Sequence, residues 1–421
     1  MTERIRATYW IETPFAPAHA AEVMAGEQSS GTFTRLPGET DALRAASAAR
    51  VERITELGEV AAPSLPCRVP ARGGKPVFRR AEVELSWPIA NMGPSLPNLL
   101  STIAGNLFEL KEFSGLRLLD ITLPDSFSHA YRGPQFAIEG TRRLTGVEGR
   151  PLIGTIIKPS VGLSPAETAQ MVGELIAGGI DFIKDDELQA NGPHNPLRAR
   201  VDAIMPLIRA HAEKTGKKVM YAFNITGEIS ELQANHDYVV KAGGSCVMVV
   251  LNSIGLPGLT YLRSFCEVPI HAHRAGWGLF SRSPHIGMSF PAYQKLWRTA
   301  GVDHLHVNGL RNKFTEQDDT VIASARACLA PMFERPGHGC EVMPVFSSGQ
   351  TVEQVADTYR ALGSIDLIYC CGGGIMGHPG GIGAGVTALH QAWQAALAGI
   401  PQDDYAREHA ELAQAIRTFR P

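Results

Sequence analysis

The chain has 421 residues, of which 44% are hydrophobic and 19% are charged, and its formal net charge is −3. This length suits one large domain plus a smaller one, and the small net charge gives no reason to expect nucleic acid or an anionic membrane as a partner. The sequence has no apolar stretch that approaches a membrane span, and its seven cysteines lack paired metal-ligand spacing, which together predict a cytoplasmic protein with reduced thiols.

Residues 1–135 predict a small α+β domain. Residues 7–11 (ATYWI) and 82–87 (EVELSW) are typical of strands, and residues 41–56 are typical of a helix. No signal-peptide apolar region precedes the first strand.

Residues 136–421 predict a second domain in which short apolar runs alternate with helical patterns, the mark of repeated βα units. A helix over residues 164–177 begins with Ser164 as N-cap, and another is expected over residues 403–420. Eight runs predict strands: 152–158, 180–187, 218–226, 245–252, 268–274, 303–309, 342–349 and 366–373. Eight such units match a (β/α)8 TIM barrel, and a doubly wound open sheet is the alternative.

The second run ends in an amine and three carboxylates, in the four residues from Lys184 to Glu187. Buried charges of this kind cost several kcal/mol each unless they are paired or bind a metal. Alternation along a strand places Lys184 and Asp186 on one face and Asp185 on the other. Oxygen ligands suit Mg²⁺, and reaction of Lys184 with CO₂ would turn an unsuitable ammonium into a third anionic ligand. A plain ion pair between Lys184 and Asp186 is the alternative.

Most polar and glycine residues of the eight runs stand at the C-terminal ends of the runs, where active sites form in a TIM barrel. They are Lys158, Lys184 to Glu187, Asn224, Asn252, His273, Arg274, His306, Ser347 to Gly349 and Gly372 to Gly374.

The segment from Gly179 to Glu187 resembles the carbamylated-lysine motif of RuBisCO, the ribulose bisphosphate carboxylase large subunit, and the whole chain is more similar to the RuBisCO-like (form IV) proteins. The resemblance implies that Mg²⁺ is held by a carbamate on Lys184, formed with CO₂, together with Asp186 and Glu187.

The resemblance also implies roles for the neighbouring strand ends. Lys158 matches a lysine that moves protons at the substrate carbon, and His273 lies near the reacting oxygens. Arg274 and His306 hold a phosphate, a task that suits the two parallel donors of a guanidinium. Lys313 corresponds to a lysine in a mobile loop, although loop lysines are commonly just solvated.

Two further groups of residues match parts of the family that bind ligands. Ser347, Gly349, Gly372 and Gly373 match loops that bind a second anionic group, where glycine lets backbone N–H groups approach closely. Glu27, Thr32 and Asn106 match segments that reach into the active site of a partner subunit, which implies a homodimer with shared active sites.

Departures from the family pattern indicate a different substrate. Carboxylases carry a second lysine where this chain has Ser160, a histidine where it has Trp277, a tryptophan where it has Phe33, and a glycine where it has Ser348. The metal motif is unchanged. We therefore expect enolate chemistry to be retained on another sugar phosphate.

The first hypothesis is a Mg²⁺-dependent decarboxylase (carboxy-lyase) acting on a β-keto sugar-acid phosphate such as 3-oxo-isoapionate 4-phosphate. A transcarboxylase/hydrolase on the same substrate would use the same residues. A 2,3-diketo-5-methylthiopentyl-1-phosphate enolase of methionine salvage needs only one phosphate site. True ribulose bisphosphate carboxylation ranks lower because of Ser160, and an inactive metabolite-binding protein would not require the complete metal motif.

Overall fold

The computed structural model describes residues 3–31, 36–71 and 75–420. The chain folds into two compact units. The smaller unit comprises residues 1–131, 276–299 and 332–338, and the larger comprises residues 132–275, 300–331 and 339–421. Two short segments from the C-terminal half of the chain therefore belong to the smaller unit.

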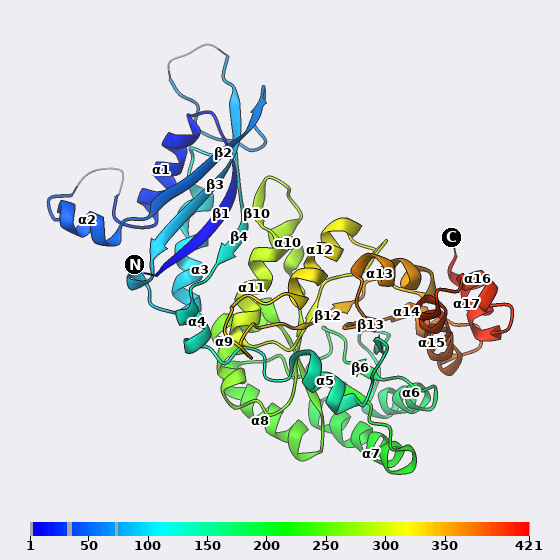
Figure 1. The fold of residues 1–421 in the computed structure, drawn as a ribbon. Helices are drawn as coiled ribbons and strands as arrows, with labels where there is room; N and C mark the ends of the chain where they lie inside the picture. The colour runs from blue at the N-terminus through cyan, green and yellow to red at the C-terminus, as the bar shows by residue number, and fades with distance from the viewer. Residues whose placement is uncertain (1–2, 32–35, 72–74, 421) are drawn as a thin grey trace. The chain divides into compact units, whose positions relative to one another are not determined.

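The smaller unit is built on a five-stranded sheet in the order β10-β4-β1-β3-β2 (Figure 1). The strands are β1 (Arg4–Thr13), β2 (Arg50–Val60), β3 (Phe78–Pro88), β4 (Gly115–Thr122) and β10 (Ile286–Met288). All neighbours are antiparallel except β10 and β4, which run parallel. This sheet contains both predicted strands of the N-terminal region.

The helices of this unit differ from the prediction at one place. They are α1 (Pro17–Glu27), α2 (Asp41–Ser47), η1 (Ile89–Asn91), α3 (Leu96–Ala104), η2 (Asn106–Glu109), α4 (Asp125–Ala130), α10 (Trp277–Ser281) and α11 (Phe290–Ala300), the last of which ends in the larger unit. The helix predicted over residues 41–56 is wrong beyond Ser47, because the chain becomes extended at Ala48 and then enters β2. Pairing with β3 over the full length of β2 outweighs the weak local helix preference of that segment.

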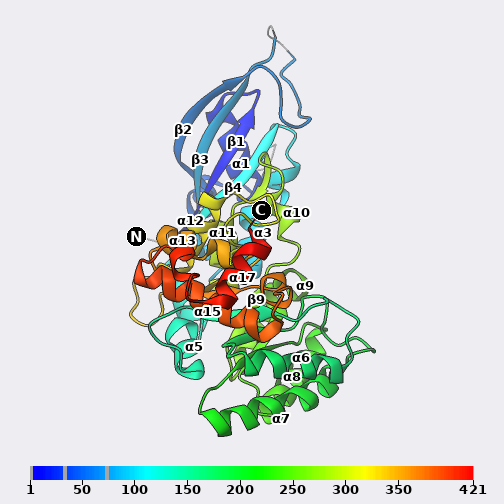
Figure 2. The ribbon, with the colours of Figure 1, turned by 90° about the vertical axis from the view of Figure 1, so that its right-hand side faces the viewer.

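The larger unit is a closed parallel barrel, as predicted. Figure 2 shows three of its helices, α6, α7 and α8, lying together in green. Its strands are β5 (Leu152–Ile156), β6 (Phe182–Lys184), β7 (Met220–Asn224), β8 (Cys246–Val250), β9 (Ile270–His273), β11 (His304–His306), β12 (Met343–Phe346) and β13 (Ile368–Cys370). Each of the eight lies inside one of the predicted runs, and β9 pairs with β11 to complete the closure. The (β/α)8 prediction is confirmed.

Helices connect the strands on the outside of the barrel, and α6, α7 and α8 lie side by side (Figure 1). The helices are α5 (Ala137–Thr145), α6 (Pro165–Ala177), α7 (Leu197–Thr215), α8 (Ile229–Lys241), α9 (Leu251–Phe265), α12 (Asp318–Leu329), η3 (Val352–Gln354), α13 (Val355–Leu362), α14 (Gly373–Met376), α15 (Ile382–Ala398), α16 (Gln402–Tyr405) and α17 (Ala410–Phe419). Ser164 caps α6 in a reciprocal capping box with Glu167, as predicted. The helix predicted over residues 403–420 is interrupted between α16 and α17.

The barrel interior is filled by small and medium apolar side chains, so it is a packed core. The buried residues of this core are Val147, Leu152, Phe182, Met220, Ala222, Cys246, Met248, Met343, Val345, Ile368 and Cys370. Because the strands are parallel and the ring is closed, their C-terminal ends meet at one mouth.

A buried carboxylate, Asp303, organises the opposite end of the barrel. Its Oδ1 accepts hydrogen bonds from the backbone N–H groups of Gln135, Phe136 and Ala137 at 2.9, 2.6 and 2.9 Å. Its Oδ2 accepts from Arg263 at 2.9 Å and from the N–H of Ile270 at 2.8 Å. Asp303 thereby joins the start of α5 to two barrel strands.

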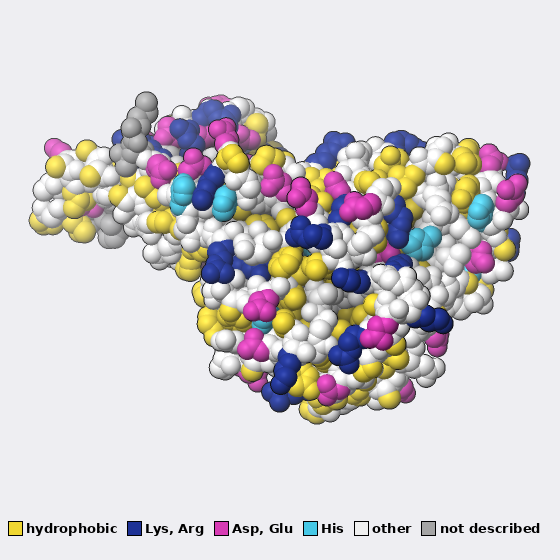
Figure 3. Space-filling model, turned by 60° about the horizontal axis from the view of Figure 1, so that its bottom comes forward, with side chains coloured by type: hydrophobic (Ala, Val, Ile, Leu, Met, Phe, Trp, Pro, Cys, Tyr) yellow, Lys and Arg dark blue, Asp and Glu magenta, His cyan; other side chains and the backbone are white. Residues whose placement is uncertain are grey.

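The surface carries mixed charges. On the face drawn in Figure 3, side chains of both signs are interspersed over the described residues. Among the helices that the structure describes, none is long and apolar enough to cross a membrane.

We expect Asp303→Asn to lower the free energy of unfolding by about 3 to 5 kcal/mol, because it leaves the buried Arg263 without its counter-charge and turns an NH₂ toward backbone donors. Urea denaturation measures this loss. Asp404→Asn is the matched control, since Asp404 is 51% exposed and pairs only with Arg407, and it should change stability by less than about 0.5 kcal/mol. Equal losses in the two variants would contradict the role given to Asp303.

Candidate active site

The barrel mouth brings the candidate residues of the larger unit onto successive strand ends. Lys184, Asn224, His273 and His306 are the last residues of β6, β7, β9 and β11, and Ser347 follows β12 directly. Lys158 follows β5 by two residues, and Gly372 follows β13 by two residues. The sequence placed these residues on separate strands, and closure of the barrel brings those strand ends to one mouth.

Four charged groups form the centre of this arrangement. Lys184 is fully buried, and its Nζ donates to the backbone oxygen of Asp185 at 2.8 Å and lies 3.5 Å from Glu187 Oε2. Asp186 is also buried, and its Oδ2 lies 2.5 Å from Lys158 Nζ. The mouth therefore alternates two ammonium groups with two carboxylates.

Asp185 faces away from this cluster, as strand alternation predicts. Its Oδ2 lies 3.0 Å from the fully buried guanidinium of Arg200 and accepts from the N–H of Asn224 at 2.8 Å. Its Oδ1 accepts from the hydroxyl of Tyr221 at 2.6 Å. These contacts use both carboxylate oxygens, so Asp185 supports the strand end and is not available as a ligand at the mouth.

His273 connects the charged cluster to the next strands. Its Nε2 lies 3.4 Å from Glu187 Oε2, and its ring centroid lies 4.6 Å from that of His306. Burial and the nearby Lys184 ammonium lower the pKa of His273 to about 3, so the imidazole is neutral near pH 7. Burial by itself would raise the pKa of Glu187, but the surrounding positive charges outweigh it and keep this carboxylate ionised. Because His273 is neutral, Lys184 and Lys158 are the cations that lower the pKa of Glu187.

His306 is hydrogen-bonded on both ring nitrogens within the barrel. Its Nε2 lies 2.8 Å from Nε2 of His271, and its Nδ1 lies 3.0 Å from Oγ of Ser347. His271 in turn contacts His304, whose Nε2 lies 2.7 Å from Oγ1 of Thr141. Sequence analysis assigned no role to His271, His304 or Thr141.

Arg274 lies against an acidic partner that sequence reasoning missed. Its Nη2 contacts Glu316 Oε2 at 2.5 Å, and the same oxygen accepts from Asn308 Nδ2 at 2.6 Å. Asn308 Oδ1 accepts from the hydroxyl of Ser348 at 2.8 Å. Glu316 lies in the loop between β11 and α12, where no periodic spacing could have identified it.

The loops after β11, β12 and β13 differ in exposure. Lys313 is exposed, with its Nζ over the ring of Phe314, and its N–H donates to the backbone oxygen of Ser348 at 3.2 Å. Gly349 has a φ of 89°, a conformation that favours glycine. A Cβ on Gly372 would lie 3.7 Å from carbons of the Lys158 side chain, which places Gly372 next to this lysine, and the exposed Gly373 follows it.

The residues predicted to act on a partner subunit belong to the smaller unit. Asn106 Nδ2 donates to Glu27 Oε1 at 3.3 Å, so these two exposed side chains lie together. Thr32 lies outside the described residues. Trp277 also belongs to this unit and packs on Tyr293, with ring centroids 4.5 Å apart.

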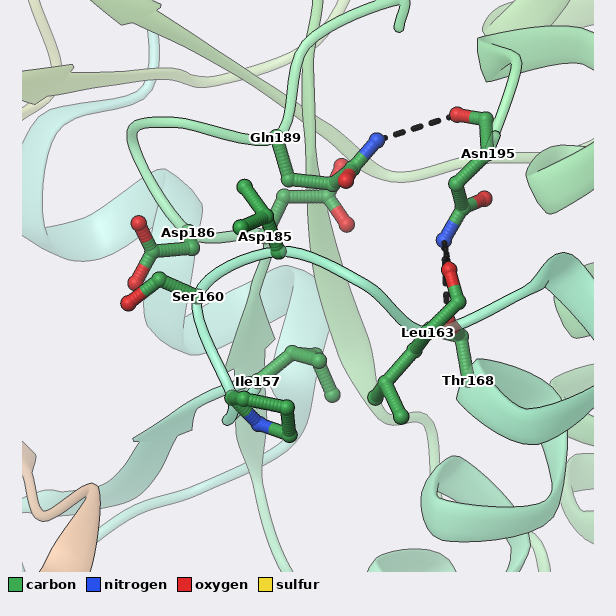
Figure 4. Close-up of a pocket in the computed structure, with 10 residues that line it drawn as sticks. Ile157, Ser160, Leu163, Thr168, Asp185, Asp186, Gln189 and Asn195 are labelled. Atoms are coloured by element: carbon green, nitrogen blue, oxygen red, sulfur yellow. Dashed lines mark hydrogen bonds between the residues drawn. The ribbon is translucent and has the colours of Figure 1, made fainter. Parts of the chain in front are cut away.

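A small hollow adjoins the charged cluster (Figure 4). It has an empty volume of about 220 Å³, part of it open to solvent, and Ser160, Asp186 and Gln189 are among its lining residues. Figure 4 shows the side chains of Ser160 and Asp186 side by side. The Ser160 hydroxyl also accepts from Lys158 Nζ at 3.0 Å. Ser160 therefore lies next to both Lys158 and the hollow.

Two family models together match nearly the whole chain. The N-terminal domain of the ribulose bisphosphate carboxylase large chain matches residues 5–127, and its catalytic domain matches residues 137–419. This chain belongs to the RuBisCO large-chain family. The family predicted from the residue pattern is confirmed.

Several relatives of this RuBisCO-like chain match at full length. A 3-oxo-isoapionate-4-phosphate transcarboxylase/hydrolase of Xanthobacter autotrophicus is 56% identical over 100% of both chains. A 3-oxo-isoapionate-4-phosphate decarboxylase of Rhizobium etli is 47% identical over 99% of this chain and 98% of its own. The crystal structure of a rubisco-like protein from Burkholderia fungorum, 47% identical, matches with a TM-score of 0.92 over 99% of this chain and 100% of its own. The relatives named for an activity are enzymes, which supports the prediction of an enzyme.

The donor set of the RuBisCO-like mouth can be tested against a divalent cation. Among the described residues, no group of three or more His, Cys, Asp and Glu side chains could hold a metal ion. Asp186 and Glu187 supply two carboxylates, and an unmodified Lys184 would repel a cation. The residues fit Mg²⁺ when Lys184 carries a carbamate, which replaces the positive charge with a third oxygen donor.

We expect the neighbours Asp185 and Asp186 to respond differently to the same substitution. Asp185→Asn should lower the free energy of unfolding by about 3 to 5 kcal/mol, because Arg200 is fully buried and pairs with no other carboxylate among the residues that the structure describes. Asp186→Asn should lower the free energy of unfolding by about 1 kcal/mol or less, because its partner Lys158 is 35% exposed. Once the carboxylate is lost, the Lys158 ammonium can be hydrated by solvent. Urea denaturation in a chelating buffer compares them, and a larger loss in Asp186→Asn would be the contrary result.

Proposed function

We propose that this chain is a RuBisCO-like enzyme that acts on 3-oxo-isoapionate 4-phosphate or a closely related β-keto sugar-acid phosphate. The observation that carries the proposal is the pair of full-length relatives, 56% and 47% identical, whose names specify this one substrate. The presence of Ser160 beside Lys158 supports a substrate other than ribulose bisphosphate, because a CO₂-fixing site of this family has a cation there.

We favour the transcarboxylase/hydrolase reaction, since the relative with that name is the more similar of the two. Decarboxylation, which the residue pattern alone placed first, remains the second candidate because two relatives with that name are 47% identical. The two reactions would use the same strand-end residues. They differ in the step that follows substrate binding. In hydrolysis water adds to the ketone, and in decarboxylation CO₂ is lost.

The proposed cofactor is Mg²⁺, held by Asp186, Glu187 and a carbamate formed from CO₂ on Lys184. When bound there, Mg²⁺ would act as a Lewis acid toward the ketone and carboxylate oxygens of the substrate. Two observations support this assignment. Lys184 is fully buried at the end of β6, and its Nζ lies 3.5 Å from Oε2 of Glu187, so a carbamate on Lys184 would place its oxygens next to that carboxylate.

Lys158 is the proposed proton donor. In decarboxylation, the bond to the carboxylate breaks, CO₂ leaves, and the electron pair stays on carbon as an enolate, to which the Lys158 ammonium gives a proton. In hydrolysis, water adds to the ketone carbon, the adjacent carbon–carbon bond breaks, and Lys158 protonates the departing carbon. The contacts of Lys158 with Asp186 and Ser160 support this role, because they hold its Nζ at the mouth.

Arg274 is the proposed phosphate partner, and its pairing with Glu316 holds the guanidinium in place. His273, neutral and partly exposed, would serve as a hydrogen-bonding partner of the reacting oxygens. Lys313 remains a proposed loop contact. Gly349, Gly372 and Gly373 would offer backbone N–H groups to an anionic end of the substrate.

We also infer a homodimer with shared active sites, in which Glu27 and Asn106 contact the substrate of the partner subunit. The exposure of both side chains supports this. A dimeric archaeal Rubisco from Hyperthermus butylicus, 31% identical, matches with a TM-score of 0.85 over 99% of this chain and 96% of its own.

Product analysis separates the two reactions. The assay contains 3-oxo-isoapionate 4-phosphate, Mg²⁺ and bicarbonate. For the hydrolase reaction we expect one water to be consumed and two acids to form, one of them a glycolate-type acid. CO₂ should not be released in stoichiometric amount. Decarboxylation would instead give one CO₂ and one ketose phosphate per substrate. Nuclear magnetic resonance of the products and a coupled CO₂ assay measure this. If the purified enzyme gave neither product set, the proposed function would be wrong.

Lys184→Met tests the carbamate. We expect it to lower kcat/KM by about 1,000-fold or more, the size of effect seen when a main electrostatic group is lost. It should also remove the carbamate carbonyl signal that ¹³C-labelled bicarbonate gives in the unmodified chain. Lys241→Met, on the exposed end of α8, is the control and should keep both. Retained activity in Lys184→Met would count against the assignment.

A further inference from the structure

Asn224 ends β7 and is fully buried, and no step of the proposed reaction uses it. Its side-chain amide has two N–H bonds that donate and an oxygen that accepts through two lone pairs. Protein atoms occupy all four of these positions, two from the turn after β6 and two from Thr226. Asn224 therefore has no position left for a ligand, and its function lies in what these bonds hold.

The two donors of Asn224 hold consecutive carbonyl groups. Nδ2 donates to the backbone oxygen of Asp186 at 3.1 Å and to that of Glu187 at 3.3 Å. Along an extended strand, consecutive carbonyl groups point in opposite directions, so one amide group reaches both only where the chain turns. The contacts of Asn224 therefore require a turn at these two residues.

The chain does turn directly after Asp186. The N–H of Gln189 donates to the backbone oxygen of Asp186 at 3.0 Å. The N–H of Leu188 donates to Oδ1 of the same aspartate at 3.1 Å, which is the contact of an Asx turn. Together with the two bonds from Asn224, these contacts hold residues 186–189 in one conformation.

This turn decides the side on which Glu187 lies. Strand alternation places Lys184 and Asp186 on one face and would send Glu187 to the other. In the structure β6 ends at Lys184, and Oε2 of Glu187 lies 3.5 Å from Nζ of that lysine. The turn thus brings Glu187 to the face that Lys184 and Asp186 share.

The orientation of the Asn224 amide follows from its partners. The backbone N–H of Thr226 can only donate, and it lies 3.1 Å from Oδ1. The hydroxyl of Thr226 accepts from the N–H of Val250 at 2.9 Å, so its own proton is available to Oδ1 at 2.6 Å. The backbone oxygens of Asp186 and Glu187 can only accept, so they must face Nδ2. A reversed amide would set donor against donor and acceptor against acceptor.

The arrangement is anchored on the barrel strands. Val250 is the last residue of β8, and Asn224 is the last residue of β7. The backbone N–H of Asn224 also donates to Oδ2 of Asp185 at 2.8 Å. The turn after β6 is therefore held from two neighbouring strand ends.

We propose that Asn224 is a positioning residue for the cation site, which fixes the turn that presents the carboxylates of Asp186 and Glu187 on one side of the mouth. Asn224 would not bind the cation itself, because both lone pairs of Oδ1 are used within the chain. The inference rests on the proposed function in one respect, because the cation is the proposed Mg²⁺ held with a carbamate on Lys184.

Asn224→Ala tests this role through metal affinity. Mn²⁺ replaces Mg²⁺ as a paramagnetic probe, and electron paramagnetic resonance in bicarbonate buffer measures its dissociation constant. We expect this constant to rise about 10- to 100-fold, the usual effect of losing a group that holds metal ligands in place. A folded Asn224→Ala protein that binds Mn²⁺ as tightly as the wild type would overturn the inference, since a purely structural residue would change stability and not this affinity.

Asn312→Ala is the matched control. Nδ2 of Asn312 also donates to two backbone oxygens, those of Gly309 and Glu316, but in the loop after β11. Its loss should leave the dissociation constant of Mn²⁺ within about twofold, because Asn312 holds no residue that would bind the cation. An equal loss of affinity in Asn312→Ala and Asn224→Ala would count against the inference.

Thr226 offers a second, milder pair of variants. Thr226→Val removes the hydroxyl that donates to Oδ1 of Asn224, and it should raise the dissociation constant of Mn²⁺ about 3- to 10-fold, the effect of one hydrogen bond. Thr226→Ser keeps the hydroxyl and should stay within about twofold of the wild type. If Asn224→Ala does not fold, this pair decides, and equal constants in the two variants would contradict the inference.

Hydrogen exchange tests the turn without a metal. In metal-free Asn224→Ala protein, the N–H groups of Leu188 and Gln189 should exchange about 10-fold faster or more, because the turn opens more often. Mass spectrometry of a peptide that covers residues 185–190 measures this, and Asn312→Ala should leave the exchange unchanged. Unchanged exchange in Asn224→Ala would overturn the inference. A wild-type chain that binds no Mn²⁺ in bicarbonate would overturn the proposed cofactor, and the exchange measurement would still decide whether Asn224 holds the turn.

Discussion

The fully buried side chain of Lys184 is the constraint on which the rest of the mouth depends. While Lys184 is unmodified, its positive charge must be balanced, and Glu187 Oε2 lies 3.5 Å from Nζ while the backbone oxygen of Asp185 accepts a hydrogen bond from Nζ. The proposed carbamate would reverse this charge, and Mg²⁺ would then supply the balance. A second ion pair lies beside Lys184, in which Asp186 balances the charge of Lys158. Two opposed pairs side by side hold four reactive groups within one small region of a rigid barrel.

Barrel closure explains why these groups meet. Each strand contributes one or two polar residues at its C-terminal end, and a closed parallel ring leaves those ends no other place than a common mouth. The neighbouring carboxylates Asp185 and Asp186 have different roles at the end of this strand. Asp185 faces Arg200 and Tyr221 and supports the strand, and Asp186 faces the mouth.

The sequence predicted the barrel because each of its strands is a compact apolar run with a polar end, and that pattern depends on neighbours close in the chain. It failed at residues 48–56, where pairing of β2 with β3 decides the conformation and local preference is weak. It also gave no sign that β10 joins the sheet of the smaller unit, because such pairing depends on residues about 170 positions apart.

Within the candidate site, the charged residues at strand ends could be predicted from the sequence. The residues that support them through contacts between distant parts of the chain could not. Lys184 and Lys158 stand out by charge in an apolar setting. Glu316 stands in a loop, and its relation to Arg274 exists only in three dimensions. Thr141 is one of several threonines, and nothing in its neighbourhood along the chain connects it with His304.

The two networks of the mouth impose different chemistry on the two sides of a bound substrate. Around Lys184 and Lys158, charged donors and carboxylates are suited to moving protons and stabilising negative charge. Around Ser347, buried histidine rings are hydrogen-bonded to one another, and Arg274, paired with Glu316, supplies a charged group beside them. Both sides of the mouth therefore present cations, Lys158 on one and Arg274 on the other. Two separated cations suit the proposed sugar-acid phosphate, because its carboxylate and its phosphate can each meet one of them.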